Sequence, residues 1–387
     1  MKIAHLNLLP FRYTGIENKL IEQANAAKNS GLDIDYFILN NEKEYQKDNL
    51  IYKKFNYPSN KLVKKIMNRF FKFSLINNSV NLDKYDAIVL RYPRPVSYDW
   101  KKFTDRYAGK VVTEHHAIAL PEIISKVTFG NILNYVQEII NNKRFKDNLI
   151  GLIGVTEEIT REESKKNYHI QTQTISNGIN VSEVTFTKFM PFDKKSFTMT
   201  IVASEYAPWH GLDKLLKALL EFETHLIITL NIVGEHISDE DKTLIKKINS
   251  SKNNVHVHTL GVKRGKELDA IFSSSTLAIG SLAIYRQKLK EACALKVREY
   301  LARGIPFVYS AGDPDVPNDA SFALQIPNDD SPININEIIE FMEKVSTHKD
   351  ISEEMRSFAL KQVDWKIKVK MMYQFVQDIK HNIERNN

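Results

Sequence analysis

The sequence contains almost no cysteine and no long hydrophobic segment. Of its 387 residues only Cys293 is a cysteine, which excludes an internal disulfide framework and a cysteine-rich metal site. No apolar run reaches the roughly 20 residues that span a bilayer, and the apolar stretch within residues 1–10 is too short for a signal peptide. The expected location is therefore cytoplasmic, where the environment is reducing.

Two common nucleotide-binding signatures are also missing. Neither the motif G-x-G-x-x-G nor a P-loop occurs, so a nicotinamide-dependent enzyme and a P-loop NTPase are disfavoured. The composition is that of a soluble globular protein, with 43% hydrophobic and 26% charged residues. The length is sufficient for two domains.

Acidic residues are absent from residues 51–80, which hold seven Lys and Arg side chains and thus account for the whole net charge of +7. Apolar residues between Leu62 and Phe71 recur at helical spacing, with the cations largely on the opposite face. This pattern predicts a basic amphipathic helix that binds the inner surface of an anionic membrane. The alternative is a surface helix that packs its apolar side on its own domain. The candidate membrane residues are Lys61, Lys64, Lys65, Arg69, Phe70, Phe71 and Lys72.

The same charge distribution disfavours a nucleic-acid partner. Outside residues 51–80 the charges sum to zero, and the chain shows no further basic stripe and no recognition motif.

Strands and helices alternate along the chain in two series, which predicts two parallel sheets covered by helices. We expect an N-terminal domain over residues 1–190, with residues 51–80 as a basic insert, and a C-terminal domain over residues 191–365. Two doubly wound α/β domains in tandem place a cleft between the carboxyl ends of their strands, where ligands bind. The strands expected in the first series are 2–9, 32–39, 85–90, 110–114 and 150–155, and those in the second are 197–203, 226–233, 255–260, 277–280 and 305–310.

Glu291 and Glu299 stand eight positions apart in the second series. A helix that begins near Ala294 and ends at Gly304 presents its first free N–H groups to an anion. One carboxylate then lies before the helix and the other along its side, an arrangement that suits a sugar nucleotide with a central phosphate. The alternative is an amphipathic helix with a solvated Glu at each end.

Five segments resemble, in the same order, those of GT-B glycosyltransferases, most closely family 4, whose members are retaining enzymes that use nucleoside diphosphate sugars. The first three are residues 176–186, 201–216 and 230–234. The others are residues 291–308 and the C-terminal stretch from Trp365 to Tyr373. Within the fourth segment, residues 295–308 further resemble a subgroup common in bacterial capsule and surface-polysaccharide clusters.

The resemblance implies two Rossmann-like domains facing across a cleft, with a C-terminal helix over residues 366–387 that packs back on the first. The implied reaction is the transfer of a sugar from a nucleoside diphosphate sugar to a hydroxyl of a lipid-linked or growing surface glycan. It implies retention of configuration and no metal or other cofactor.

The resemblance also implies roles for individual residues. Glu291 is expected to bind the donor sugar hydroxyls, and Glu299 the ribose. One of His115 and His116 is expected near the reacting sugar carbon, although either is also compatible with a structural histidine. The remaining expected donor-binding residues are Gly234, His210, Gly211, Ala294, Leu295 and Lys296.

The chain departs from the family where an Arg and a Lys normally neutralise the diphosphate. Ser204 or Glu205 stands in the Arg position and His210 in the Lys position. Other cations must contribute if the site binds a diphosphate. The candidates are Lys263, Arg264, Arg286, Lys288 and Lys296, each of which is alternatively a solvated surface charge. On the acceptor side, the first loop offers Arg12 and Gly15.

Asp313-Pro-Asp315 resembles the Asp-x-Asp metal motif of the other major glycosyltransferase fold, but Pro314 favours a turn, so we assign no metal. Two further functions are compatible with the same fold. The missing Arg and Lys also suit a non-catalytic sugar-nucleotide-binding protein, and a sugar-nucleotide epimerase or a phosphorylase shares the fold without explaining the basic helix.

Overall fold

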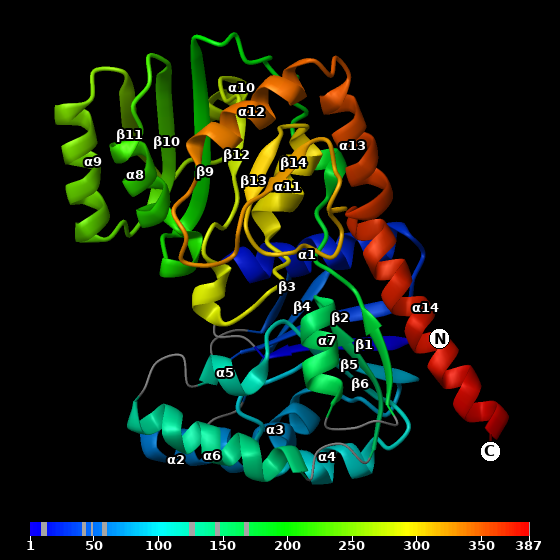
Figure 1. The fold of residues 1–387 in the computed structure, drawn as a ribbon. Helices are drawn as coiled ribbons and strands as arrows, with labels where there is room; N and C mark the ends of the chain where they lie inside the picture. The colour runs from blue at the N-terminus through cyan, green and yellow to red at the C-terminus, as the bar shows by residue number, and fades with distance from the viewer. Residues whose placement is uncertain are drawn as a thin grey trace. The chain divides into compact units, whose positions relative to one another are not determined.

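The structure is a computed structural model that describes residues 1–8, 14–40, 44–47, 49–55, 60–123, 128–143, 148–165 and 170–386. Contacts divide the chain into two compact units (Figure 1). Unit 1 comprises Met1–Ser176 and Trp365–Asn387, and unit 2 comprises Asn177–Asp364.

Unit 1 contains an eight-stranded sheet of order β3-β4-β2-β1-β5-β6-β7-β8. Every pair is parallel except β3 with β4. The inner strands β1, β5 and β6 are buried on both faces, as expected for a parallel sheet that is covered by helices on both sides. The strands are β1 (Ile3–Leu8), β2 (Ile34–Asn40), β3 (Tyr45–Lys47), β4 (Leu50–Lys54), β5 (Ala87–Arg91), β6 (Val111–His115), β7 (Leu149–Gly154) and β8 (Gln171–Thr174).

The helices of unit 1 bury two apolar clusters against this sheet. In one of them the C-terminal helix α14 (Trp365–Asn386) packs Val369 and Val376 beside α1 (Thr14–Asn29), and Tyr373 Oη donates to the Met1 carbonyl at 2.8 Å. The remaining helices are α2 (Lys61–Phe70), α3 (Lys72–Ser79), α4 (Trp100–Arg106), α5 (Ala119–Ile123), α6 (Phe129–Lys143) and α7 (Glu157–Ser164).

Unit 2 contains a six-stranded parallel sheet of order β11-β10-β9-β12-β13-β14. Numbered within the unit, this is the 3-2-1-4-5-6 order of the Rossmann fold. The strands are β9 (Ser196–Glu205), β10 (Ile227–Glu235), β11 (Val255–Gly261), β12 (Leu277–Ile279), β13 (Phe307–Tyr309) and β14 (Ala323–Gln325). Both units are thus Rossmann-like, which confirms the predicted fold class.

The helices of unit 2 surround one continuous apolar core. They are α8 (Leu212–Glu221), α9 (Asp239–Ser251), α10 (Lys266–Ser273), α11 (Leu295–Arg303), α12 (Ile335–Ser346) and α13 (Ile351–Gln362). Three short 3₁₀ turns join the elements: η1 (Val181–Glu183), η2 (Pro208–His210) and η3 (Ile284–Gln287).

Residues 177–190, which the expected boundary assigned to the first domain, fold with unit 2. Val181 and Phe189 are buried in the core of unit 2, and the Phe189 N–H donates to Ser352 Oγ at 2.8 Å. The expected boundary followed the strand-and-helix periodicity, which stops before residue 190. The apolar side chains of this irregular segment are nevertheless buried, and they pack in the core of unit 2.

The predicted insert 51–80 is only partly an insert. Its first residues belong to β4, which pairs with β2 inside the sheet. Phe73 and Ile76 of α3 are buried in the core of unit 1. The predicted amphipathic helix corresponds to α2, which begins after Asn60, whose side chain accepts from the Leu62 N–H at 2.8 Å and so caps the helix. Within the described ranges, no helix is long and apolar enough to span a membrane.

Candidate functional site

The candidate site of unit 2 lies at the carboxyl edge of its sheet, where β9 and β12 are neighbours and the strand order reverses. Ligands of open α/β sheets bind at such switch points. Here η2 follows β9, η3 follows β12, and the two turns are joined by backbone hydrogen bonds. The Leu282 N–H donates to the His210 carbonyl at 3.1 Å, and the Ala283 N–H donates to the Trp209 carbonyl at 3.2 Å.

The helix α11 begins and ends where the sequence predicts. Its N-cap residue is Ala294, which provides no capping side chain, and its first turn holds no acidic residue. At its other end Gly304 adopts φ 80°, and the Ile305 N–H donates to the Tyr300 carbonyl at 3.1 Å. A side chain at Gly304 would come within 2.8 Å of the Ser352 carbonyl oxygen. The N-terminus of α11 therefore keeps backbone N–H groups that no side chain of the N-cap satisfies.

Glu291 is held just before α11 by a short parallel bridge to Gly312. The Ala292 N–H donates to the Gly312 carbonyl at 2.8 Å, and the Gly312 N–H donates to the Lys290 carbonyl at 3.0 Å. These bonds fix the backbone on both sides of Glu291, so its half-buried side chain starts from a defined position.

Glu299 lies inside α11 and is oriented by Arg303, one turn later. Both Nε and Nη2 of Arg303 donate to the same oxygen, Glu299 Oε1, at 3.0 and 2.8 Å. Arg303 Nη1 also donates to Asp269 of α10 at 2.7 Å. The carboxylate of Glu299 is thus fixed through one oxygen, and Oε2 takes no part in these bonds.

His210, which stands in the position of the family's Lys, is a neutral hydrogen-bonding group. Its Nδ1 accepts from the Ala207 N–H at 3.1 Å, so the proton of the neutral ring resides on Nε2. Burial, and then the nearby charge of Lys296, lower the pKa of His210 to about 3. His210 therefore offers an N–H donor and no positive charge.

Lys296 lies in the first turn of α11, and its Nζ atom is buried without a hydrogen-bond partner among the described residues. Burial lowers the pKa of Lys296 to about 7. This is the opposite of the solvated surface charge that was the alternative interpretation for this residue.

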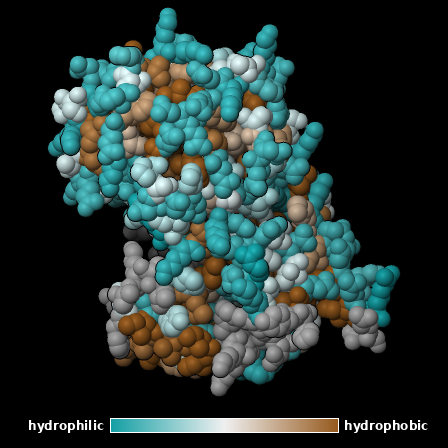
Figure 2. Space-filling view, viewed as in Figure 1, coloured by the Kyte–Doolittle hydropathy of each residue, from teal (hydrophilic) through white to brown (hydrophobic). Residues whose placement is uncertain are grey.

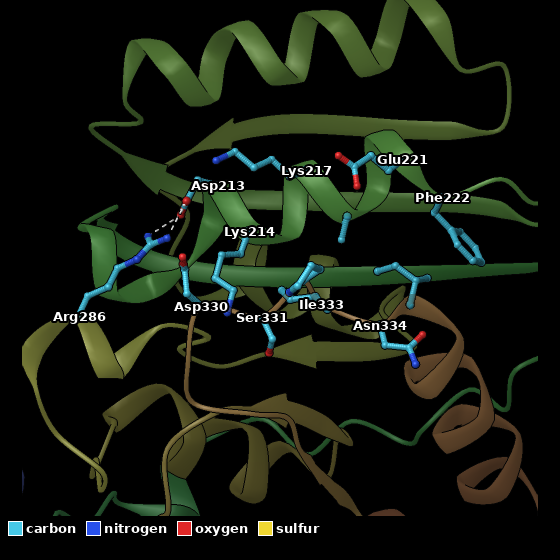
Figure 3. A pocket seen from close by; sticks show the side chains of 13 residues that line it. Asp213, Lys214, Lys217, Glu221, Phe222, Arg286, Asp330, Ser331, Ile333 and Asn334 are labelled. Carbon is cyan, nitrogen blue, oxygen red and sulfur yellow. Dashed lines mark hydrogen bonds and ion pairs between the residues drawn. The ribbon is translucent and has the colours of Figure 1, made fainter.

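The other candidate cations of unit 2 are paired or exposed. Arg286 donates to both carboxylate oxygens of Asp213 at 2.7 and 2.8 Å, on the wall of a pocket of about 430 Å³ beside α8 (Figure 3). Lys263 donates to Glu267 at 2.8 Å. Arg264 and Lys288 are exposed. None of these four combines burial with an unused charge.

Glycines shape the edge of the site at two places. Gly234 adopts φ 137°, and a side chain there would lie 1.8 Å from the Ala203 carbonyl oxygen, because the ends of β9 and β10 approach closely. Gly211, at φ 70°, starts α8, and a side chain there would lie 2.9 Å from Leu282 Cβ. Only glycine permits these backbone positions.

Asp313 and Asp315 form an ion-pair cluster with Arg298, a residue that the sequence reasoning did not single out. Arg298 is fully buried, and its Nη2 donates to Asp313 at 2.8 Å and also to Asp315. Its Nε donates to the Asn177 carbonyl at 2.9 Å. Among the residues that the structure describes, no group of three or more His, Cys, Asp or Glu side chains could hold a metal ion. The sequence could have indicated this cluster, because Arg298 lies in a predicted helix that is followed by an Asp-Pro-Asp loop.

In unit 1 the two candidate histidines occupy different environments. His115 is only 2% exposed, stacks on Tyr92 at 4.4 Å between ring centroids, and lies 3.1 Å from Thr113 Oγ1. His116 follows β6 and is half-buried. The position of His115 inside the core does not fit a side chain that reaches a substrate, so the geometry favours His116.

Glu114 holds the ring of His116. One carboxylate oxygen of Glu114 lies 3.2 Å from His116 Nε2, and the other lies 3.2 Å from His5 Nε2. Burial first, then the charges of Arg91 and Lys19, lower the pKa of His116 to about 3. His116 is thus a neutral, oriented imidazole.

The acceptor-side and membrane candidates are placed as follows. Gly15 lies in the first turn of α1 instead of a loop, and it is exposed. Arg12 and the side chains of Lys61 and Lys65 lie outside the described residues. Lys72 donates to the Pro95 carbonyl at 3.3 Å, and burial lowers its pKa to about 8, so it does not extend into solvent as expected.

An apolar surface, here called the α2–α6 surface, lies on unit 1 (Figure 2). Leu62 is 66% exposed, and Phe70 stacks on Tyr98 at 4.9 Å. Arg69 Nη2 joins the two helices by donating to Asn134 Oδ1 at 3.0 Å. The exposed apolar residues of this surface are Leu62, Val63, Ile66, Phe70, Phe71, Ile132, Leu133, Val136, Ile139 and Ile140.

Residues 186–358 match the model of the family described as Glycosyl transferases group 1. This match covers most of unit 2, including η2, α11 and both glutamates. No curated protein matches the chain in sequence.

Solved structures are similar to nearly the whole chain. A glycosyltransferase from Rickettsia africae has 15% identity and a TM-score of 0.64, with 98% of each chain covered. A sucrose-phosphate synthase from Thermosynechococcus elongatus has 13% identity and a TM-score of 0.62, over 98% of this chain and 99% of that one. HepE from Anabaena, in complex with UDP and glucose, has 15% identity and a TM-score of 0.61, over 98% and 100%. These similarities show that the fold is GT-B.

Proposed function

We propose that this protein is a glycosyltransferase that moves a sugar from a nucleoside diphosphate sugar to a hydroxyl group, with retention of configuration. The observation that carries the proposal is the environment of α11. Its uncapped N-terminus is preceded by the fixed Glu291 and followed, on the same helix, by the oriented Glu299. This arrangement lies in the segment that matches the group 1 family model.

The chemistry requires that negative charge be stabilised on the departing diphosphate while the sugar carbon becomes cationic. Backbone N–H groups at the N-terminus of α11 supply fixed donors for the diphosphate. In this proposal Glu299 Oε2 accepts from ribose hydroxyls, and Glu291 accepts from hydroxyls of the donor sugar. The structure of HepE contains UDP and glucose, which supports a nucleotide sugar as the donor here.

We propose that the reaction is metal-independent, because the carboxylates of the Asp-x-Asp sequence are already engaged by Arg298. The proposed acceptor is a lipid-linked or growing surface glycan, as the resemblance of residues 295–308 to the capsule subgroup implies. His116 is the proposed polar group of unit 1 near the reacting carbon, because its ring is neutral and oriented.

The experiment is a panel of sugar nucleotides incubated with the purified protein. A donor that binds the native state raises its unfolding temperature, and slow hydrolysis or transfer releases a nucleoside diphosphate that coupled enzymes detect. The configuration of the released or transferred sugar, read by NMR, tests retention. Binding of a sugar nucleotide without release of nucleoside diphosphate over many hours would indicate a non-catalytic binding protein. A product with inverted configuration would contradict the retaining mechanism.

We further propose that the α2–α6 surface binds an anionic membrane. α2 contains no acidic residue. The one acid of α6, Glu138, is fully buried and accepts from Tyr92 Oη and from the Val96 N–H. The apolar surface is therefore bordered by cations such as Arg69 and by no exposed carboxylate of these two helices, a combination that anionic lipid headgroups attract. This would hold the enzyme at the inner face of the plasma membrane, beside a lipid-linked acceptor.

Flotation with vesicles of phosphatidylglycerol and phosphatidylcholine tests this proposal. Two sets of substitutions are compared with wild type: Ile66→Ser with Leu133→Ser, and Lys64→Glu with Arg69→Glu. The first should reduce binding at all salt concentrations, and the second should reduce it most at low salt. Leu360→Ser, at a residue of α13 that is 48% exposed, is the control. If both sets of variants float with the vesicles as wild type does, the membrane proposal is contradicted.

A further inference from the structure

The buried, unpartnered ammonium of Lys296 is unusual in unit 2. The neighbouring buried cations Arg298 and Arg303 both have carboxylate partners. Lys296 Nζ has no hydrogen-bond partner among the described residues, and no carboxylate offsets the effect of burial on its pKa. An isolated buried charge is unfavourable, and proteins retain one mainly where it serves function.

The groups around this ammonium are also hydrogen-bond donors. His210 is close enough for the charge of Lys296 to lower the pKa of the imidazole. Because His210 Nδ1 accepts from the Ala207 N–H, only Nε2–H is available to a ligand. The N-terminus of α11 adds backbone N–H groups, since Ala294 provides no capping side chain and the first turn holds no acid.

A ligand that fits this site must complement three kinds of hydrogen-bond donor. One of them is an ammonium without a carboxylate partner in the described part of the chain. The ligand must be an anion with several acceptor oxygens, since one ammonium, one imidazole N–H and a helix N-terminus each need an oxygen partner. A diphosphate satisfies this requirement, whereas a neutral sugar does not.

We propose that Lys296 is the cation that binds the diphosphate of the donor, assisted by the neutral Nε2–H of His210. In this chain Lys296 takes over the function of the Arg and Lys that the loop after β9 lacks. The inference rests on the proposed function, because it assigns the phosphates of the sugar nucleotide to these groups.

Isothermal titration calorimetry at pH 8 tests the assignment with UDP, GDP, ADP, CDP and dTDP as probes. A lysine with a pKa of about 7 is mostly neutral at this pH, and a bound diphosphate should hold it charged. Binding should therefore take up about 0.9 proton per site. Titrations in buffers of different ionisation enthalpy measure this uptake directly.

Two variants and one control separate charge from structure. Lys296→Met should weaken the binding of the nucleoside diphosphate at least about tenfold and abolish the proton uptake. Lys296→Arg should retain more of the affinity but take up no proton, because a guanidinium stays charged at pH 8. Lys247→Met removes an exposed charge of α9 and should match wild type.

The outcomes distinguish this inference from the function on which it rests. If a nucleoside diphosphate binds wild type and Lys296→Met alike, with the same proton uptake, the inference is overturned and the proposed function stands. If none of the five nucleoside diphosphates binds wild type, both are overturned. Loss of affinity together with loss of proton uptake in Lys296→Met, with both retained in Lys247→Met, supports the assignment.

Discussion

Arg298 and Asp313 form an ion pair enclosed within unit 2, with 2.8 Å between Arg298 Nη2 and Asp313 Oδ1. The same guanidinium holds the Asn177 carbonyl, and Asn177 Nδ2 donates to the Cys293 carbonyl at 2.8 Å. The pair therefore links the loop after β13 to the segment that leads into α11, and it positions the candidate donor site.

Arg298→Met should destabilise unit 2 strongly, because it leaves the buried carboxylate of Asp313 without its cation. Breaking a buried ion pair from one side lowers the free energy of unfolding by about 3–5 kcal/mol. Urea unfolding measures the change. Arg264→Met, at an exposed arginine, should change it by less than about 0.5 kcal/mol. Adding Asp313→Asn and Asp315→Asn to Arg298→Met should recover part of the lost free energy of unfolding. If Arg298→Met alone were as stable as wild type, the ion pair would not have the structural role described here.

Glu299→Gln should weaken the binding of a nucleoside diphosphate about tenfold. The amide retains the shape of the carboxylate but accepts less strongly from ribose hydroxyls, and charge-assisted hydrogen bonds contribute about 1.5–3 kcal/mol. Calorimetry measures the affinity, and Glu340→Gln, at an exposed glutamate of α12, is the control. Equal affinities for Glu299→Gln and wild type would remove Glu299 from the ribose role.

Lys296→Met should raise the unfolding temperature of the ligand-free protein while it lowers nucleotide affinity. The folded state holds the pKa of Lys296 near 7, below its ordinary value of 10.5. Between these two pH values the unfolded chain binds a proton that the folded chain does not, so the free energy of unfolding rises with pH. The penalty for burying Lys296 is full below pH 7 and disappears toward pH 10.5.

Thermal unfolding at pH 6.5 and pH 9.5 checks this sign. The unfolding temperature of Lys296→Met should exceed that of wild type most at pH 6.5, and the difference should be smaller at pH 9.5. Each kcal/mol of added stability raises the unfolding temperature by about 2–4 °C. A variant that is less stable than wild type at pH 6.5 would show that Lys296 has a structural role instead.

His115→Ala and His116→Ala should have separate effects. Removing the buried ring of His115 leaves a cavity beside Tyr92 and should lower the free energy of unfolding by about 2–4 kcal/mol. His116→Ala should lower kcat with a smaller change in stability. Because the pKa of His116 is about 3, the pH dependence of kcat between pH 5 and 8 should be the same in His116→Asn and wild type. A titration in that range that disappears in His116→Asn would contradict a neutral His116.

The sequence predicted the parts of the fold that depend on local periodicity. Buried strands such as β1 and β10, and the limits of α11, follow from apolar runs and from Gly304. It missed β4, because residues 51–80 were assigned to a basic amphipathic insert, whereas β4 pairs with β2 and extends the sheet. It also missed the exposed apolar face of α6, since amphipathic spacing does not reveal which face a domain leaves uncovered.

Charge partners were less predictable, because they depend on contacts between residues far apart in the chain. Arg286 and Lys296 were equivalent candidates by sequence. The structure pairs Arg286 with Asp213, 73 positions away, but gives the Nζ atom of Lys296 no hydrogen-bond partner among the described residues. Long-range contacts also distinguish His115 from His116, which are neighbours in the chain. His115 ends β6 and stacks on Tyr92, whereas His116 follows β6 and lies beside Glu114.

The most direct test of the donor site is a crystal structure of the protein with the nucleoside diphosphate that binds it best. We expect phosphate oxygens within hydrogen-bond distance of the N-terminus of α11 and of Lys296 Nζ, and ribose hydroxyls on Glu299 Oε2. A nucleotide bound elsewhere, for example in the pocket lined by Lys214, Lys217 and Arg286 (Figure 3), would contradict this expectation.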